Sequence, residues 1–536
     1  MQPTVSTLPL NAKIAVVGAG VSGLTFTYFL SKLRPDVNVT LYESKERCGG
    51  WIHSETINDH DGSQVMVEKG PRTLRGVSDG SVIIVETLRD LGKQDVIQYI
   101  APNSEANRKF LLDQNDVLTQ VPDSPATALK FISGSLGKGF IPGILGEPFR
   151  LSKTTRSDES AHSFIKRRFG NEYLSQNVFS ALFHGIYAGD IKKLSAKRTI
   201  GKMVDMEKTA GSLIKSMLNN TINKYNKRGD TKVKTTELSP LLKKFGAATG
   251  KSDEDLLSVS LRLKEFPMIG FKTGLECYPK TLTEYITSLP NVTIKHEAAN
   301  SVLPGKHGKG VIIESDSGDL TFEHARLTIT PNILANMVQF EPVAKKLREV
   351  HSNTVLLVNF YLPHKDLLSS YHGFGYLVPQ SNQNQEKLLG VIFDSVIEKN
   401  FKPVFESESE ASKKVQETKY TKVTAMLGGH YLNNEGEQNI PSESIIINSV
   451  KSAFMKHLHI DENDLEDGRW EVTVAKDCLP QYHVGYDDWV QQTAELIQER
   501  YSDNVSLGGM AFSTGPGVPN VIEDAFESAY MLSEAN

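Results

Sequence analysis

The segment AKIAVVGAGVSG, from Ala12 to Gly23, decides the fold of this chain. Its first half is apolar and typical of a buried strand, and Val21–Leu33 then follows the pattern of an apolar helix. A second strand, Val37–Tyr42, ends directly before the acid Glu43. This strand–helix–strand order, with a GxGxxG turn before the helix, predicts a dinucleotide-binding unit.

The glycine turn and the acid after it have separate expected roles. The glycines allow a tight turn and a close backbone approach, the helix N-terminus receives a pyrophosphate, and Glu43 accepts the ribose hydroxyls. A tight strand–helix turn that binds nothing is the alternative. The predicted contacts in the turn are Gly18, Ala19, Gly20, Val21, Ser22 and Gly23.

The residues after Glu43 favour FAD over NAD. Glycines directly after the ribose acid let an extended chain fold back over the dinucleotide, and Arg47 can neutralise a phosphate. The stretch Glu43–Trp51 resembles the ExxxRxGG extension of the amine-oxidase-like flavoproteins, and it adds Ser44, Arg47, Gly50 and Trp51 to the predicted cofactor site. A surface arginine is the alternative for Arg47.

Two further loops are expected at the flavin. The Gly-Pro turn in Gly70, Pro71, Arg72 and Thr73 corresponds to a loop that runs along the flavin edge in these flavoproteins. Near the C-terminus, a glycine-rich loop leads into a final helix from about Asn520 to Ser533, whose N-terminus would stabilise a reduced flavin. Ordinary turns are the alternative for both loops. Met510, Val518, Pro519, Asn520 and Ala299 complete the predicted cofactor contacts.

Composition sets the broad class of the protein. A chain of 536 residues suggests about three units, and 39% hydrophobic residues with 23% charged residues is ordinary for a globular protein. The net charge of −5 gives no reason to expect nucleic acid. The three cysteines lie far apart, so neither a disulfide framework nor a metal site is expected. Asn219–Glu237 and Phe405–Thr418 are polar and predict solvated insertions.

Narrower motifs resemble one family within these flavoproteins. They are Gly49–Ile52, Glu68–Arg75, the segment HGIYAGD at His184–Asp190, GFGYLVP at Gly373–Pro379, Gly390–Ser395, Met426–Gly429 and KDCLPQY at Lys476–Tyr482. In this order they resemble the protoporphyrinogen oxidase family, most closely its fungal form. The resemblance implies the oxidation of protoporphyrinogen IX to protoporphyrin IX in three two-electron steps, with O₂ as acceptor and H₂O₂ as product. The flavin would carry the chemistry, so no catalytic side chain is expected.

The resemblance also implies an α/β fold, with α+β parts, in three domains. The first is a Rossmann-like FAD domain of the p-hydroxybenzoate hydroxylase type. The second is a substrate domain with a mixed sheet, and the third is a helical membrane-contact domain. The expected boundaries are 1–97, 266–345 and 476–536 for FAD, 98–115, 200–265 and 346–475 for substrate, and 116–199 for the helices.

The substrate would be a large apolar macrocycle with two propionates. The resemblance implies that Phe374 and Leu377 clamp its faces and that Gly185 contacts it. Many relatives have an arginine directly before a phenylalanine where this chain has Lys109 before Phe110, and a lysine lacks the bidentate fork. Lys109 is the predicted cation for a propionate, and Arg108 takes that role if the strand register differs by one. Core strand residues are the alternative for the two clamps.

A membrane surface is a further predicted partner. Ser124–Gly146 has no acid, two lysines and scattered large apolar residues, which suits a bilayer interface, and a helical hairpin over the core is the alternative. The resemblance implies peripheral attachment to the mitochondrial inner membrane, contact with the next haem-pathway enzyme and a homodimer. The first 35 residues lack acids, as a mitochondrial presequence does, but they include the first strand, so we expect no cleaved signal.

Two rival functions follow from the same motifs. One is another FAD-dependent oxidase, acting on amines or polyenes. Several such enzymes attach FAD through a cysteine near the C-terminal loop, whereas Leu507–Asn520 contains none, so we expect non-covalent FAD. The other rival is a binding protein of the Rab-escort type, without redox activity. The intact flavin-facing loops at both ends of the chain argue against this binding protein.

Overall fold

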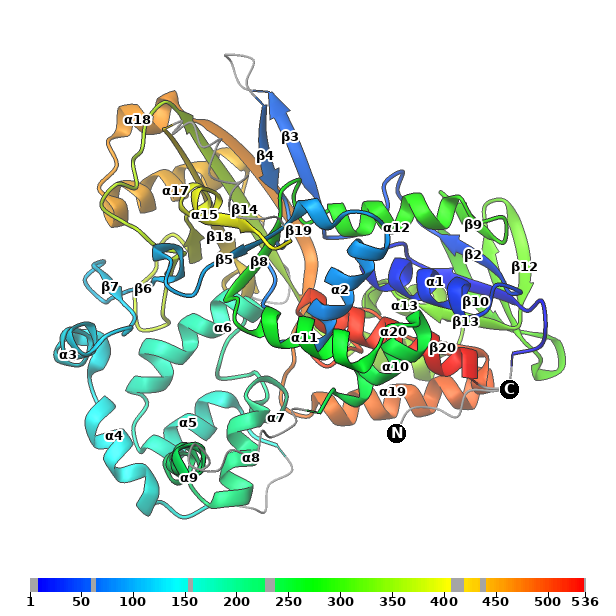
Figure 1. The fold of residues 1–536 in the computed structure, drawn as a ribbon, viewed down its shortest axis with the longest axis horizontal. Helices are drawn as coiled ribbons and strands as arrows, with labels where there is room; N and C mark the ends of the chain where they lie inside the picture. Colours follow the sequence, from blue (N-terminus) through cyan, green and yellow to red (C-terminus); the bar gives the residue numbers. More distant parts are fainter. Residues whose placement is uncertain are drawn as a thin grey trace.

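The computed structural model describes residues 8–58, 64–152, 158–226, 237–405, 419–433 and 440–534. Figure 1 shows three parts: a parallel-sheet lobe at the right, a strand-rich lobe at the upper left and a group of helices at the lower left. We call them the parallel-sheet lobe, the seven-strand lobe and the helical lobe. Both the first strand and the last helix of the chain belong to the parallel-sheet lobe.

The parallel-sheet lobe is built around the predicted strand–helix–strand unit. Its five parallel strands lie in the order β20 (Val505–Leu507), β13 (His324–Leu327), β1 (Lys13–Val17), β2 (Asn38–Tyr42) and β9 (Val292–Lys295). Alternate β1 side chains enter two apolar clusters, one on each face. One face packs with α1 (Val21–Leu33), α2 (Asp79–Asp90), α10 (Pro240–Thr249), α11 (Asp253–Lys264), α12 (Cys277–Thr287) and α20 (Val518–Glu534). The other packs with β10 (Ala299–Pro304), β11 (Val311–Ser315), β12 (Gly318–Phe322), α13 (Pro331–Met337), α14 (Glu341–Arg348) and α19 (Tyr486–Tyr501).

The seven-strand lobe holds a mixed sheet. Its order is β19 (Arg469–Pro480), β14 (Ser352–Pro363), β18 (Tyr420–Gly428), β16 (Leu388–Ile392), β15 (Gly375–Leu377), β6 (Lys109–Leu112) and β7 (Leu118–Gln120). α15 (Asp394–Asn400), α17 (Glu443–Leu458) and α18 (Glu462–Asp467) belong to this lobe. Two smaller sheets lie beside it: the hairpin β3 (Ser54–Asn58) with β4 (Gln64–Glu68), and β17 (Phe401–Pro403) with β5 (Ile97–Ile100) and β8 (Met268–Phe271).

The helical lobe and the second face of the parallel sheet contribute residues to one continuous apolar cluster. The helices of this lobe are α3 (Pro125–Ser133), α4 (Phe140–Gly146), α5 (Ala161–Phe169), α6 (Ser180–Tyr187), α7 (Ala196–Thr199), α8 (Gly201–Ala210) and α9 (Leu213–Asn226). Within the described ranges, none of the helices is long and apolar enough to cross a membrane.

Residues 200–265 pack differently from the expected substrate domain. α8 and α9 lie in the helical lobe, while α10 and α11 pack against α2 in the parallel-sheet lobe. α10 and α11 pack there because they bury apolar side chains in the same cluster as α1 and α20. These side chains are Leu242, Phe245, Leu256 and Leu263. Of the two predicted insertions, residues 219–226 continue α9, and 227–236 and 406–418 lie outside the described residues.

Candidate cofactor and substrate site

The turn between β1 and α1 contains glycines with different steric demands. Gly18 has a φ of 98°, in the left-handed region that glycine tolerates best. A methyl group built on Gly23 would lie 2.0 Å from the Gly18 carbonyl oxygen, so this glycine lets α1 pack on β1. Apart from chain neighbours, a methyl group on Gly20 would approach only the Gly50 Cα among the described residues, at 3.9 Å. Packing therefore does not demand glycine at position 20, whereas a diphosphate at the helix end does.

Glu43 is held beside the same turn. One carboxylate oxygen accepts a hydrogen bond from the Ala19 amide at 2.9 Å, and the other accepts one from the Lys45 amide at 3.0 Å. Among the described residues, no side chain caps the N-terminus of α1, so that helix end is open to an anion. The turn thus offers positive backbone dipoles for a phosphate next to a carboxylate that suits ribose hydroxyls.

Arg47 shapes the loop that covers the glycine turn. Its guanidinium donates to three carbonyls of residues 48–52 at 2.6 to 3.0 Å and pairs with Glu276 at 2.9 Å. The Gly49 amide in this loop donates to the Ala19 carbonyl at 2.8 Å. Arg47 therefore has a structural role that the motif did not predict, and its contact with a phosphate stays a prediction.

The loop Gly70–Thr73 ties the parallel-sheet lobe to the seven-strand lobe. Arg72 pairs with Asp394 at 2.5 Å, and both side chains are more than nine-tenths buried. The Thr424 hydroxyl donates to the other Asp394 oxygen at 2.7 Å. A cavity of about 530 Å³, lined by Glu68, Arg72 and Asp394 among others, lies beside this pair. Arg72 thus fixes the loop, while its contact with a flavin stays a prediction.

The segment Gly509–Asn520 reaches the glycine turn from the other end of the chain. The Gly509 amide donates to the Ser22 hydroxyl at 3.1 Å. A methyl group built on Gly80 would lie 2.1 Å from the Pro519 carbonyl oxygen, so α2 packs closely on the start of α20. The two ends of the chain therefore meet at one site. Met510, Val518, Pro519 and Asn520 are half-buried along it.

The remaining predicted cofactor residues surround this site. Ser44 is exposed directly after Glu43, and the Lys45 ammonium lies 5.8 Å from the centre of the Trp51 ring. Ala299 is half-buried at the start of β10, just past the carboxyl end of β9. Their contacts with a cofactor stay predictions.

Three of the four predicted substrate residues lie where α6 packs against β15. β15 pairs in parallel with β6, so Gly375 is the partner of Lys109 and Leu377 is the partner of Leu111. Lys109, Leu111 and Leu377 therefore share one face of the sheet, the face toward the helical lobe. A methyl group built on Gly185 in α6 would lie 2.9 Å from a Leu377 methyl, so this glycine permits the close approach.

Phe374 lies on the opposite face. It packs against a cluster that contains Tyr376, whose hydroxyl lies 3.0 Å from Nδ1 of His457 on α17. The expectation that Phe374 and Leu377 together clamp one macrocycle therefore does not match this arrangement. The reason is their odd spacing, because side chains three residues apart in a strand point to opposite faces.

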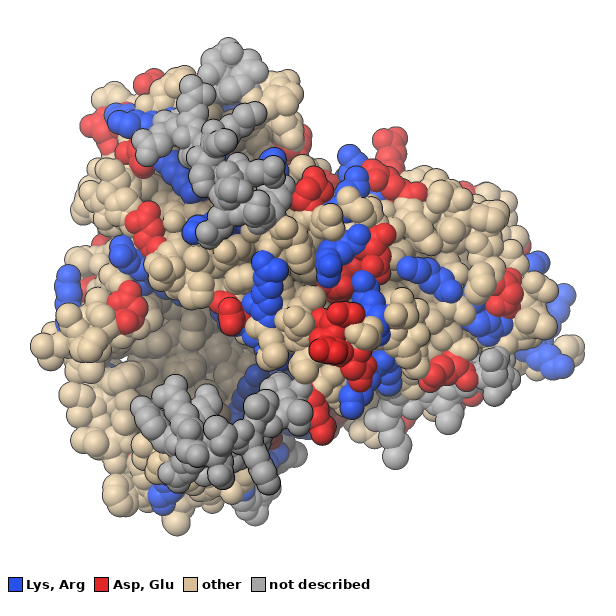
Figure 2. Space-filling model, viewed as in Figure 1, with Lys and Arg blue, Asp and Glu red and all other residues tan. Residues whose placement is uncertain are grey.

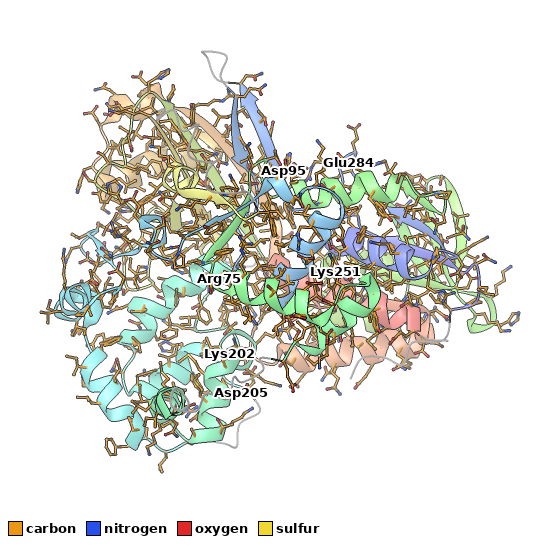
Figure 3. The ribbon with its side chains drawn as sticks, viewed as in Figure 1. Arg75, Asp95, Lys202, Asp205, Lys251 and Glu284 are labelled. Atoms are coloured by element: carbon orange, nitrogen blue, oxygen red, sulfur yellow. The ribbon has the colours of Figure 1, made fainter. Side chains whose placement is uncertain are left out.

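Lys109 faces a second cation that the motifs did not single out. Partial burial and the nearby Arg75 guanidinium lower the pKa of Lys109 below its usual 10.5. In the part of the chain that the structure describes, none of the exposed cations Lys109, Arg108 and Arg75 has a carboxylate within 4 Å, whereas the buried Arg72, Arg168 and Arg326 each have one. Figure 2 shows a hollow between the helical lobe and the rest of the molecule, and Figure 3 places Arg75 near its inner edge. The charges of Lys109 and Arg75 are thus available to an anionic ligand.

A histidine pair lies beside Gly185 and was not predicted. Nε2 of His184 and Nε2 of His430 are 2.9 Å apart, and Nδ1 of His184 lies 2.6 Å from the Val378 carbonyl oxygen. The carbonyl can only accept, so His184 is protonated at Nδ1 and His430 donates to it. Burial, and for His184 also the charge of its partner, lower the pKa of both rings. His184 belongs to the HGIYAGD motif, but no local pattern points to His430.

The chain is similar to known flavoproteins over nearly its whole length. A family described as Flavin containing amine oxidoreductase matches residues 21–535. A Protoporphyrinogen oxidase from Saccharomyces cerevisiae is 49% identical over 537 residues, which covers 98% of each chain. The chain belongs to the protoporphyrinogen oxidases, within this flavoprotein family.

More distant members have the same length and fold. A Protoporphyrinogen oxidase from Schizosaccharomyces pombe is 27% identical and covers 97% of this chain, which in turn covers 98% of that protein. The crystal structure of a putative protoporphyrinogen oxidase from Exiguobacterium superposes with a TM-score of 0.69 at 18% identity, over 97% of this chain and 98% of that one. The chain therefore has the amine-oxidase-type FAD-binding fold.

The family makes this chain an FAD-dependent oxidoreductase. The residues present fit the cofactor. The space above Gly20, the uncapped N-terminus of α1 and the carboxylate of Glu43 suit the pyrophosphate and ribose. The loop before α20 reaches the same region from the C-terminal end, where the Gly509 amide donates to the Ser22 hydroxyl.

Proposed function

We propose that this chain oxidises protoporphyrinogen IX to protoporphyrin IX in haem synthesis. The observation that carries the proposal is the 49% identity to the yeast Protoporphyrinogen oxidase along 98% of both chains. Bound FAD would accept two electrons in each of three steps and pass them to O₂, which gives H₂O₂. The absence of a cysteine in Leu507–Asn520 supports non-covalent FAD.

Unpaired cations and an apolar surface support the proposal that protoporphyrinogen IX is the substrate. Lys109 and Leu377 share the sheet face toward the helical lobe, and Arg75 lies close to Lys109. A macrocycle with two propionates needs an apolar surface with positive charge at one edge. The test is an aerobic assay with protoporphyrinogen IX that follows porphyrin fluorescence. Oxidation no faster than with heat-killed protein would refute the proposal.

Lys109→Ala should lower kcat/KM for protoporphyrinogen IX by about 10- to 100-fold. The change removes one charge-assisted contact, worth about 1.5–3 kcal/mol, while FAD content stays the same. Lys109→Arg should retain or improve activity, and the control Arg108→Ala should be nearly silent. Damage from Arg108→Ala alone would mean that the register assumed for the substrate is off by one. The dimethyl ester of the substrate gives a second check, because Lys109→Ala should not slow its oxidation.

The helical lobe carries the apolar surface that we propose to meet a membrane. Five large apolar side chains within 129–151 are exposed: Leu129 by 72%, Ile141 by 51%, Leu145 by 67%, Phe149 by 87% and Leu151 by 89%. Exposed lysines, Lys130 and Lys138, accompany them. The predicted segment ended at Gly146 and so omitted the two most exposed residues. Phe131 lies instead in the core, 3% exposed, packed with Leu136 and Ala181.

Replacing Phe149 and Leu151 together with glutamate should release the protein from membranes. Full burial of one such side chain is worth about 1.5–3 kcal/mol, so losing two should cut partitioning to vesicles by at least about 100-fold. Vesicle co-sedimentation measures this change. The matched control is the pair Ile333→Glu and Ile445→Glu, each 56% exposed but on other lobes. Equal loss in both pairs would contradict the assignment of this surface.

The location in the cell and the partners are inferred from the family. A mitochondrial inner membrane, a homodimer and contact with the next haem-pathway enzyme rest on family resemblance and stay predictions. The exposed apolar residues of the helical lobe support only the attachment to a lipid surface.

A further inference from the structure

Arg198 joins the helical lobe to the segment Met510–Gly517, the loop that we expect to face the flavin. It lies on α7, and its guanidinium donates to the Ser513 carbonyl and pairs with Asp487 at 3.1 Å. The guanidinium also lies 5.2 Å and 5.6 Å from the ring centres of Tyr482 and Tyr486. With its side chain 15% exposed, the charge is poorly screened by solvent.

The same cluster holds the flavin-facing segment at two more points. The Tyr482 hydroxyl donates to the Met510 carbonyl at 2.8 Å, and the Tyr486 hydroxyl donates to the Ala511 carbonyl at 2.9 Å. Three carbonyls within four residues are thus held by side chains from outside the segment. The Ser513 hydroxyl donates onward to the Gly515 carbonyl at 2.7 Å, which extends the constraint toward α20.

Arg198 and Tyr482 are also held to the helical lobe through Ser195. The Ser195 amide donates to the Tyr482 carbonyl at 2.7 Å, and the Ser195 hydroxyl accepts from the Arg198 amide at 3.0 Å. Nearby Lys202 and Asp205 on α8, labelled in Figure 3, lie at the junction of the two lobes. Arg198 therefore connects α7 directly to the segment Met510–Ser513.

We propose that Arg198 is a positioning residue, which holds the segment Met510–Gly517 against the flavin and so ties the cofactor's environment to the helical lobe. This rests on the proposed cofactor contacts of that segment. A fixed start of α20 would direct its positive end at the ring, and the half-buried guanidinium, although paired with Asp487, would add positive charge nearby. Both favour the anionic reduced ring over the oxidised one.

The test compares purified holoprotein of Arg198→Gln, Arg198→Lys and the exposed control Lys202→Ala. In Arg198→Gln, we expect reduced FAD to bind about tenfold more weakly relative to oxidised FAD, a fall in midpoint potential of about 30 mV. The flavin absorption bands should shift as well. Arg198→Lys should recover at least half of the fall, and Lys202→Ala should match the wild type.

A lower melting temperature with unchanged potential and absorption would mean that Arg198 is only a structural clamp, and would overturn the proposal. If Arg198→Gln fails to fold, Tyr486→Phe decides. It removes only the donor to the Ala511 carbonyl and should shift the absorption in the same direction, whereas an unchanged spectrum would overturn the proposal. A wild-type protein without yellow colour would instead refute FAD binding itself.

Discussion

Gly20→Val should give a folded protein that has lost its FAD. Apart from chain neighbours, the Cβ of the new side chain would lie 3.9 Å from the nearest described protein atom, so the side chain would start in open space. That space above Gly20 is where the pyrophosphate would approach the N-terminus of α1. A steric penalty of only about 3 kcal/mol would weaken binding more than 100-fold. The flavin absorbance per protein, measured after gel filtration, should fall to near zero, while the circular dichroism spectrum should stay that of a folded protein.

Gly23→Val provides the contrast. Its side chain would start 2.0 Å from the Gly18 carbonyl oxygen, a backbone atom that cannot move without distorting β1. We therefore expect Gly23→Val to lower the melting temperature of the FAD-free protein, which Gly20→Val should leave nearly unchanged. A yellow Gly20→Val protein with full FAD content would show that this turn does not receive the pyrophosphate.

The nucleotide-binding unit was predictable because local rules specify it. α1 runs from Val21 to Leu33, as the sequence indicates, since a glycine turn opens it and Pro35 prevents its continuation. β2 begins one residue later than expected, at Asn38, and still ends directly before Glu43. The final helix begins at Val518, two residues before the expected start.

The contacts between lobes could not be predicted in this way. Arg72 and Asp394 are 322 residues apart, Arg198 and Ser513 are 315 apart, and His184 and His430 are 246 apart. Periodicity and turn signals report only on neighbours in sequence, so they give no information on such pairs. The placement of α10 and α11 has the same cause, because an amphipathic helix shows which face it buries but not against which partner.

One long-range group should dominate the stability of the helical lobe. Arg168 and Glu147 form an ion pair in which both side chains are fully buried. Arg168 also lies 3.2 Å from Glu207. Glu147 in turn accepts hydrogen bonds from the Ser212 hydroxyl at 2.5 Å and from two backbone amides at the start of α9, at 2.8 and 3.1 Å. This carboxylate therefore needs its counter-charge more than an exposed one would.

Arg168→Met should destabilise the protein by about 3–5 kcal/mol, because it leaves a buried carboxylate without its partner. Urea unfolding followed by circular dichroism measures the change, and limited proteolysis should cut within the helical lobe first. The double variant Arg168→Met with Glu147→Gln should recover part of the loss, since the uncompensated charge is then removed. The control is Lys166→Met on the same helix. Its pair with Glu172, at 3.3 Å, is about half exposed on both sides, so the cost should stay below about 1 kcal/mol. Similar losses for Arg168→Met and Lys166→Met would mean that burial of the pair does not set its contribution.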